Sequence, residues 1–172
     1  MSNWYMLTLV GKDRPGIVAA VTTALFDADC NLGESSMIRL GQNFSVMMMV
    51  EGGDEAGVRA VLQPVAERLG LALHIDAIDP GLHQRLVPDV CIRVHGADRA
   101  GIVAQVTTRA EQAGLNILDL ESDVGGTEQQ PIYILQIEGV AEQGIDAIQT
   151  ALAPLQADGV KVDVHPIETL IG

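Results

Sequence analysis

Residues 11–23, Gly-Lys-Asp-Arg-Pro-Gly-Ile-Val-Ala-Ala-Val-Thr-Thr, decide how this chain folds, because the chain contains them twice. Residues 96–108 read Gly-Ala-Asp-Arg-Ala-Gly-Ile-Val-Ala-Gln-Val-Thr-Thr. The match runs on to Asn31 and Asn116, so that 12 of 21 positions are identical at an offset of 85. A period this long indicates that each copy is a small domain and not one turn of a solenoid.

The repeat extends past these segments. Glu51-Gly52 corresponds to Glu138-Gly139 at an offset of 87, which places two extra residues in the second copy near Gly125-Gly126. A polar stretch between Pro80 and Pro88 is typical of a linker. We therefore expect a first domain at 1–79, a linker at 80–88 and a second domain at 89–172.

Each copy has the hydrophobic pattern of a strand, a helix, two strands, a helix and a strand. The predicted strands are 4–10, 32–40, 44–51 and 71–78, then 89–95, 116–124, 132–138 and 160–167; the predicted helices are 17–28, 54–69, 102–110 and 141–157. Pro64 and Pro154 should kink or split the second helix of each copy. Two βαββαβ units, each an antiparallel sheet with helices on one face, make the ferredoxin-like α+β architecture.

The third strand of each copy is largely apolar on both faces, because the set that should face solvent is Ser45, Met47 and Met49 in the first copy and Ile132, Ile134 and Gln136 in the second. Val46, Met48 and Val50 can face the helices, yet the alternating Met47 and Met49 are apolar too. The alternative is that these are scattered surface residues, which are common. We expect instead that this second sheet face is covered by the other repeat, the linker or a second subunit.

The repeated Asp-Arg-Pro/Ala-Gly-Ile-Val segment lies between a strand and a helix. Free amides and the helix dipole make such a helix start a carboxylate site, and Gly16 or Gly101 would let a ligand approach the backbone. Asn31 and Asn116, which begin the next strands, can donate and accept hydrogen bonds to an amino-acid headgroup. The structural alternative is that Asp13 and Asp98 cap the helices, the glycines pack and the asparagines turn the chain.

A βαββαβ unit with Asp-Arg-Pro-Gly-Ile-Val at this turn resembles the ACT domain, a small regulatory module, and the resemblance covers nearly the whole chain twice. Two such units alone resemble the glycine cleavage system transcriptional repressor group. That resemblance implies a regulator that controls a separate DNA-binding activator. It also implies ligand contacts, shared between paired domains, at Asp13, Arg14, Gly16, Ile17, Asn31, Asp98, Arg99, Gly101, Ile102 and Asn116. Ala100 replaces the loop proline in the second copy.

The composition limits the classes of partner. The 172 residues carry 10 Lys and Arg against 23 Asp and Glu, a net charge of −13 that disfavours direct nucleic-acid binding. An apolar fraction of 48% excludes a disordered chain. The sequence shows neither a signal peptide nor a membrane-spanning run, and Cys30 and Cys91 form no CxxC motif. We therefore expect a cytoplasmic protein whose thiols are small core residues, with a redox sensor as the alternative.

The chemistry-bearing residues do not form a catalytic set. The four histidines are dispersed, and none lies in a metal-binding frame. An acidic row at Asp119, Glu121 and Asp123 indicates a solvated strand face, with a cation site as the alternative. We predict that the chain is not an enzyme and holds no cofactor or metal.

Two hypotheses remain open for the function. The first is an amino-acid-responsive regulator of glycine cleavage metabolism, in which a ligand such as glycine bridges the two repeats and changes the binding of a partner activator. The second is a regulatory subunit that docks on a metabolic enzyme. A homo-oligomer is compatible with both.

Overall fold

The computed structural model describes residues 3–79, 86–97, 101–127 and 130–167. It divides into residues 1–83, called unit 1, and residues 84–172, called unit 2, and each unit is described by itself. Most of the predicted linker lies outside the described residues, so the predicted domain boundaries stay predictions.

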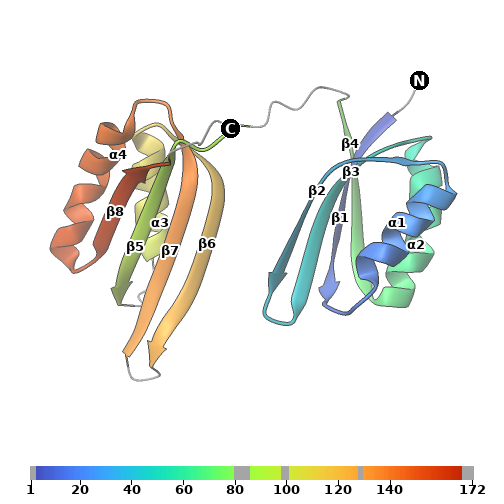
Figure 1. The fold of residues 1–172 in the computed structure, drawn as a ribbon, viewed down its shortest axis with the longest axis horizontal. Coiled ribbons are helices and arrows are strands. Elements are labelled where there is room, and N and C mark those ends of the chain that lie inside the picture. The colour runs from blue at the N-terminus through green and yellow to red at the C-terminus, as the bar shows by residue number, and fades with distance from the viewer. Residues whose placement is uncertain (1–2, 80–85, 98–100, 128–129, 168–172) are drawn as a thin grey trace. The chain divides into compact units, whose positions relative to one another are not determined.

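Unit 1 has the predicted order of elements. In chain order they are β1 (Asn3–Lys12), α1 (Ile17–Asp27), β2 (Asn31–Leu40), β3 (Asn43–Gly52), α2 (Glu55–Leu69) and β4 (Leu71–Ile78). The strands form an antiparallel sheet in the order β2-β3-β1-β4, with β2 and β4 at its edges (Figure 1).

Unit 2 repeats this topology. Its elements are β5 (Val90–Ala97), α3 (Ile102–Gln112), β6 (Leu115–Thr127), β7 (Gln130–Ala141), α4 (Ile145–Leu152), a 3₁₀ helix η1 (Ala153–Asp158) and β8 (Lys161–Pro166). The sheet order is β6-β7-β5-β8. The β6–β7 hairpin is longer than predicted, as the two extra residues near Gly125 require. The ferredoxin-like α+β prediction is thus confirmed in both units.

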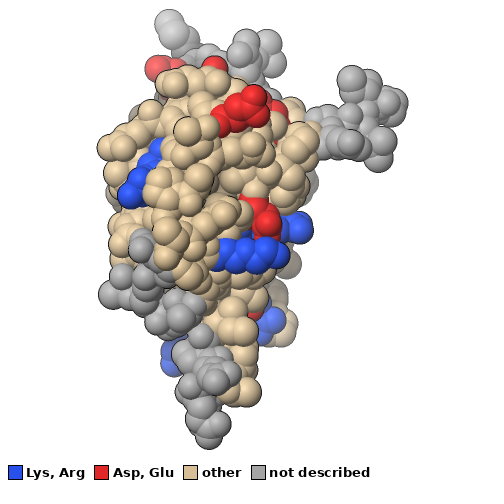
Figure 2. Space-filling model, turned by 90° about the vertical axis from the view of Figure 1, so that its left-hand side faces the viewer, with Lys and Arg blue, Asp and Glu red and all other residues tan. Residues whose placement is uncertain are grey.

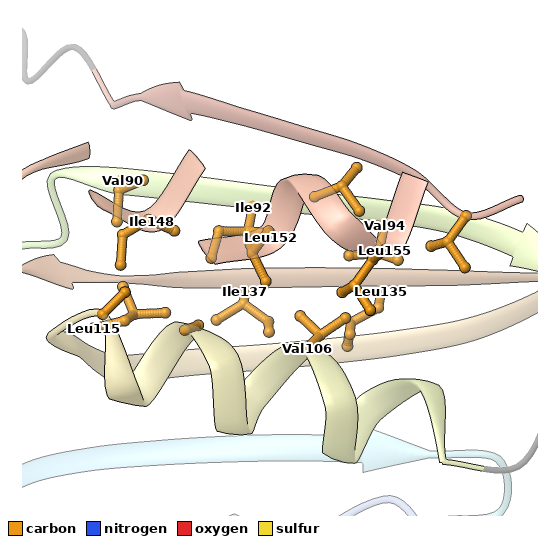
Figure 3. Packing of buried hydrophobic residues seen from close by; sticks show 14 of the residues in the cluster. Val90, Ile92, Val94, Val106, Leu115, Leu135, Ile137, Ile148, Leu152 and Leu155 are labelled. Carbon is orange, nitrogen blue, oxygen red and sulfur yellow. The ribbon is translucent and has the colours of Figure 1, made fainter. Parts of the chain in front are cut away.

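The helices cover one face of each sheet. In unit 1, Tyr5, Leu7 and Leu9 alternate along β1 and are at most 4% exposed, and they pack against Val21 and Leu25 of α1. In unit 2, side chains of β5 and β7 meet those of α3, α4 and η1 in the same way (Figure 3). Members of that core include Val90, Ile92, Val94, Val106, Leu135, Ile137, Ile148, Leu152 and Leu155.

The two prolines act differently on the second helices. Pro64 lies inside α2, which runs through it, so no split occurs there. Pro154 follows the end of α4 and lies in the first turn of η1, so the predicted break is confirmed in unit 2. Two side chains then reach back to β8, because Gln149 Nε2 donates to Val164 O at 3.2 Å and Gln156 Nε2 donates to Val162 O at 3.3 Å.

The second face of the unit 1 sheet has an apolar band that polar residues such as Thr8 and Asp76 interrupt. Val10 and Met47 on this face are 43% and 46% exposed. Trp4 lies over Gly33, where an added Cβ would be 2.9 Å from ring atom Cζ3 and 3.2 Å from Met49 Cβ. The sequence-based expectation that a further element covers this face stays a prediction.

The second face of the unit 2 sheet has a polar row across its middle, and Ile132 and Ile134 lie exposed on the same face. The register places Asp163, Arg93, Gln136 and Glu121 in one row across the four strands. Arg93 Nε donates to Gln136 Oε1 at 3.3 Å, and Gln136 Nε2 donates to Glu138 Oε1 at 3.1 Å. Equivalent strands of the two units therefore present different chemistry.

Candidate ligand site

The repeated loop opens α1 and α3 in the same unusual way. Gly16 precedes α1 with φ 90° and ψ −2°, and Gly101 precedes α3 with φ 87° and ψ −1°. Because the N-cap residue of each helix is glycine, it has no side chain that could cap the helix. An added Cβ at either glycine would meet nothing within 4 Å. Among the residues that the structure describes, no side chain accepts from the first amides of either helix, and the space beside each glycine is open.

Asp13 does not cap α1, so that alternative from the sequence is wrong. Its carboxylate Oδ2 lies 2.8 Å from Arg39 Nε of β2, and its backbone N–H donates to Gln42 O at 2.9 Å. The helix begins four residues after Asp13, beyond the reach of an ordinary N-cap. Asp98 and Arg99, with Ala100, lie outside the described residues.

Three other predicted ligand residues are engaged within the fold. Arg14 Nη2 donates to the carbonyl of Leu69, one of the last carbonyls of α2. The side chains of Ile17 and Ile102 are 2% and 3% exposed and belong to the two cores. At these isoleucines only the backbone amide can meet a ligand.

The asparagines lie at the other end of each sheet from the loops. Asn31 is opposite Glu51, which is opposite Trp4 near the start of β1, whereas the loop follows Lys12 at the end of β1. Eight residues of strand separate the two ends, a span of roughly 25 Å. In unit 2, Asn116 pairs with Val140, again beyond the start of the first strand. A headgroup cannot touch the loop and the asparagine of one unit together.

The asparagines have different surroundings in the two units. Asn31 Nδ2 donates to Glu51 Oε2 at 3.3 Å. Asn116 borders a hollow of about 480 Å³. The hollow is lined by Thr107, Glu111, Gly114, Leu115, Asn116, Ile117 and Glu142, and these residues do not include the loop glycine.

The two thiols occupy different positions. Cys30 is half-buried beside the core of unit 1, as predicted. Cys91 is buried, but it lies on β5 between Val90 and Ile92, so it points away from the helix-covered core. Burial raises the pKa of both thiols above the ordinary value, and nearby Asp29 adds to the rise at Cys30. Raised thiol pKa values give no support to the redox alternative.

The described part of the chain shows no feature that would bind a metal ion or span a membrane. Within it, no three His, Cys, Asp or Glu side chains gather closely enough to hold a metal ion. None of the described helices combines the length and hydropathy needed to cross a bilayer. On the face shown in Figure 2, Lys and Arg side chains are few, and those near the centre lie beside an acidic side chain.

The fold and the loops define a class of protein: two ferredoxin-like α+β units in tandem, each with a glycine at the N-cap of its first helix. Residues 5–76 match the family model of the ACT domain. The chain belongs to the ACT domain family. Three further similarities extend this assignment.

The glycine cleavage system transcriptional repressor of Escherichia coli is 23% identical over 163 residues, which cover 94% of this chain and 80% of the repressor. The UPF0237 protein YjhC of Lactococcus lactis is 35% identical over 83 residues, which cover 46% of this chain and 95% of that protein. A crystal structure of a protein from Galdieria sulphuraria shares the fold at a TM-score of 0.79 and 21% identity, covering 98% of this chain and all of that one. The predicted resemblance is confirmed, with the family model matching unit 1 and the same strand topology in unit 2.

Arg39 is the residue near the loop that sequence reasoning missed. It lies in a strand far from the repeated motif, and only the register of β2 brings it to Asp13. A comparison of the two copies offers a signal, because β2 contains this arginine and β6 contains no Lys or Arg.

Proposed function

We propose that this protein is an amino-acid-responsive regulator that acts by binding a protein partner. Similarity to a transcriptional repressor over 94% of the chain supports a regulatory role. The proposal has two parts, that the protein binds an amino acid and that it binds a protein partner. The observation that supports amino-acid binding is the pair of helices that start at Gly16 and Gly101, each with open space beside the glycine among the described residues. A helix start of this kind suits the carboxylate of an amino acid.

A complete headgroup site would need two domains. The loop and the asparagine of one unit lie at opposite ends of its sheet, so a ligand that meets both takes the loop of one domain and the asparagine of another. Such sharing gives a ligand different affinities for paired and unpaired domains, which is what regulation requires. The Asn116 hollow, whose mixed lining includes the carboxylates of Glu111 and Glu142, suits the amino end of the ligand.

The partner is proposed to be a protein, such as a transcription activator, and not DNA. A net charge of −13 would repel phosphates over most of the surface. Because the chain is similar to the repressor, we propose that it regulates the genes of glycine cleavage metabolism. Absence of catalysis and a cytoplasmic location remain predictions.

Calorimetry of the full chain with glycine, serine, cysteine and the branched-chain amino acids tests the ligand half. We expect at least one of them to bind and to raise the melting temperature in proportion to its excess over Kd. If none does, the ligand half is rejected while the fold assignment stands.

A regulatory subunit of a metabolic enzyme is the second candidate. The exposed apolar residues Val10 and Met47 on the second sheet face of unit 1 favour it, because such surfaces commonly bind proteins. A pull-down with Met47→Glu as the matched control separates the two candidates. If the wild type retains a transcription activator, the amino-acid-responsive regulator is supported. If the wild type retains a metabolic enzyme and Met47→Glu does not, the regulatory subunit is supported.

A further inference from the structure

Strand β6 is an edge of the unit 2 sheet (Figure 1). It pairs with β7 on one side, and among the described strands none pairs with its other side. Every residue from Leu118 to Val124 is exposed. Such an edge presents backbone N–H and C=O groups to solvent, and an added strand can bind to them.

The backbone of β8, the opposite edge strand, is already engaged. Two side chains of α4 and η1, Gln149 and Gln156, donate to its carbonyls. Between Leu118 and Val124 of β6, the one side-chain contact to the backbone that the described residues make is local, because the Val124 N–H donates to Asp123 Oδ1 at 2.8 Å. Of the two edges of unit 2, β6 is therefore the one open to a further strand.

The two faces of β6 differ in chemistry. Asp119, Glu121 and Asp123 alternate along the second sheet face, and in the described part of the chain none of them forms an ion pair. Leu120 and Val124 lie on the other face and are 41% and 54% exposed. The strand contains no Lys or Arg to balance its carboxylates. A strand added here would therefore meet acidic side chains on one face and apolar side chains on the other.

A hollow with two further carboxylates lies at the start of β6. It is the hollow of about 480 Å³ that Asn116 borders, and Glu111 and Glu142 are among its lining residues. Glu111 also lies in the last turn of α3, where the negative end of the helix dipole favours a cation. The hollow thus suits a basic side chain at one end of the added strand.

The acidic face of β6 disfavours a second copy of this chain as the added strand. An antiparallel pair of β6 strands centred on Glu121 would place Glu121 opposite its own copy and Asp119 opposite Asp123. Like charges directly opposite each other destabilise a strand pair, whereas Lys or Arg opposite each carboxylate stabilises it. The matching strand is therefore basic.

We propose that β6 and this hollow bind an extended basic segment of the protein partner, which joins the unit 2 sheet as a fifth strand. Alternate Lys or Arg side chains meet the three carboxylates, a further one enters the hollow, and the apolar side chains between them contact Leu120 and Val124. About seven residues suffice, because the strand from the hollow to Asp123 is roughly 23 Å long. The inference rests on the proposed function, since it names the surface and the chemistry of that partner contact.

Fluorescence polarisation of the full chain with a labelled peptide, Arg-Val-Lys-Val-Lys-Val-Arg, tests the inference at physiological ionic strength. We expect the wild type to bind it about three- to thirty-fold more tightly than Arg-Lys-Lys-Arg-Val-Val-Val, which has the same composition without the alternation. Asp119→Asn, Glu121→Gln and Asp123→Asn together should weaken binding by about five- to fifty-fold. Glu111→Gln with Glu142→Gln should weaken it by about two- to ten-fold.

The matched control removes the same charge from exposed side chains of unit 1, by Asp27→Asn, Asp29→Asn and Glu67→Gln, and should bind like the wild type. In the ¹⁵N-labelled chain, the peptide should shift the amides of 118–124 and not those of β2. The proposal is overturned if the wild type does not bind the alternating peptide, if the two peptides bind equally, or if the control variant weakens alike. Unchanged binding after either acidic set is neutralised, or equal shifts along β2, also overturns it.

The proposed function is tested separately in the same samples. If the pull-down retains a partner equally with the wild type and with the variant neutralised along β6, the partner contact stands and β6 is not its site. If glycine does not bind, glycine is rejected as the ligand and the peptide result is unaffected. If an amino acid binds without weakening peptide binding, the hollow is rejected as the place of its amino end, and the result at β6 stands.

Discussion

Unit 1 and unit 2 share a fold and a loop but differ around both. Both first helices begin after a glycine with φ near 90°, and neither is capped by a side chain. Around this common part, unit 1 adds Arg39 and the exposed Met47 on its second sheet face, whereas unit 2 adds a broken helix and a polar row across its second face. The comparison teaches that the two units share one conformation at the start of the first helix, whereas the surroundings of that loop differ between them.

The strongest way to test the equivalence of the units is to damage their cores at matched positions. Leu7 and Ile92 lie at the same place in β1 and β5, and both are fully buried. We expect Leu7→Ala and Ile92→Ala each to lower the free energy of unfolding by about 2–5 kcal/mol, through lost burial and the cavity left behind. Hydrogen exchange should show the loss of protection mainly in the unit that carries the substitution. Equal loss in both units would contradict the description of two separate cores.

The two prolines offer a comparison with opposite outcomes. Pro64 lies inside a continuous helix, where it lacks an N–H and crowds the preceding turn, at a cost of up to about 3 kcal/mol. Pro64→Ala should therefore raise the free energy of unfolding, by about 1–3 kcal/mol. Pro154 begins a 3₁₀ turn, where a missing N–H is tolerated, so Pro154→Ala should change stability little. Chemical denaturation of both variants checks the difference, and a larger gain at Pro154 would refute this explanation.

The repeat, the order of elements and the inward faces could be predicted because they depend on local pattern. Tyr5, Leu7 and Leu9 alternate along one strand, and that spacing alone determines their common face. The partner of Asp13 could not be predicted, since it depends on the register of a strand distant in sequence. The separation of Asn31 from the loop follows from topology: α1 crosses the sheet before β2 begins, so the two lie at opposite ends. That α2 continues through Pro64 while α4 ends before Pro154 depends on packing beyond the local sequence.

The loop glycines should respond alike in the two units. Valine at Gly16 or Gly101 must adopt a positive φ, which costs about 1–2 kcal/mol even though the space beside each glycine is empty. Gly16→Val and Gly101→Val should lower the free energy of unfolding by that amount and should block ligand approach. Gly53→Ala is the control, because Gly53 has open space and no positive φ. If a variant that carries both Gly16→Val and Gly101→Val still binds the ligand, the two helix starts are not the ligand site.

The thiols give the smallest expected difference between the units. Burial raises the pKa of Cys30 and Cys91, so the folded protein favours the neutral thiols. Iodoacetamide at pH 8 should therefore modify both more slowly than free cysteine, and Cys91 more slowly than the half-buried Cys30. Because the folded pKa values are raised, their contribution to stability is complete below the ordinary thiol pKa and is lost as pH rises through the folded values. The free energy of unfolding should fall more steeply above about pH 9 in the wild type than in a Cys30→Ser, Cys91→Ser variant. Parallel curves for the two proteins would show that the thiols do not contribute to this pH dependence.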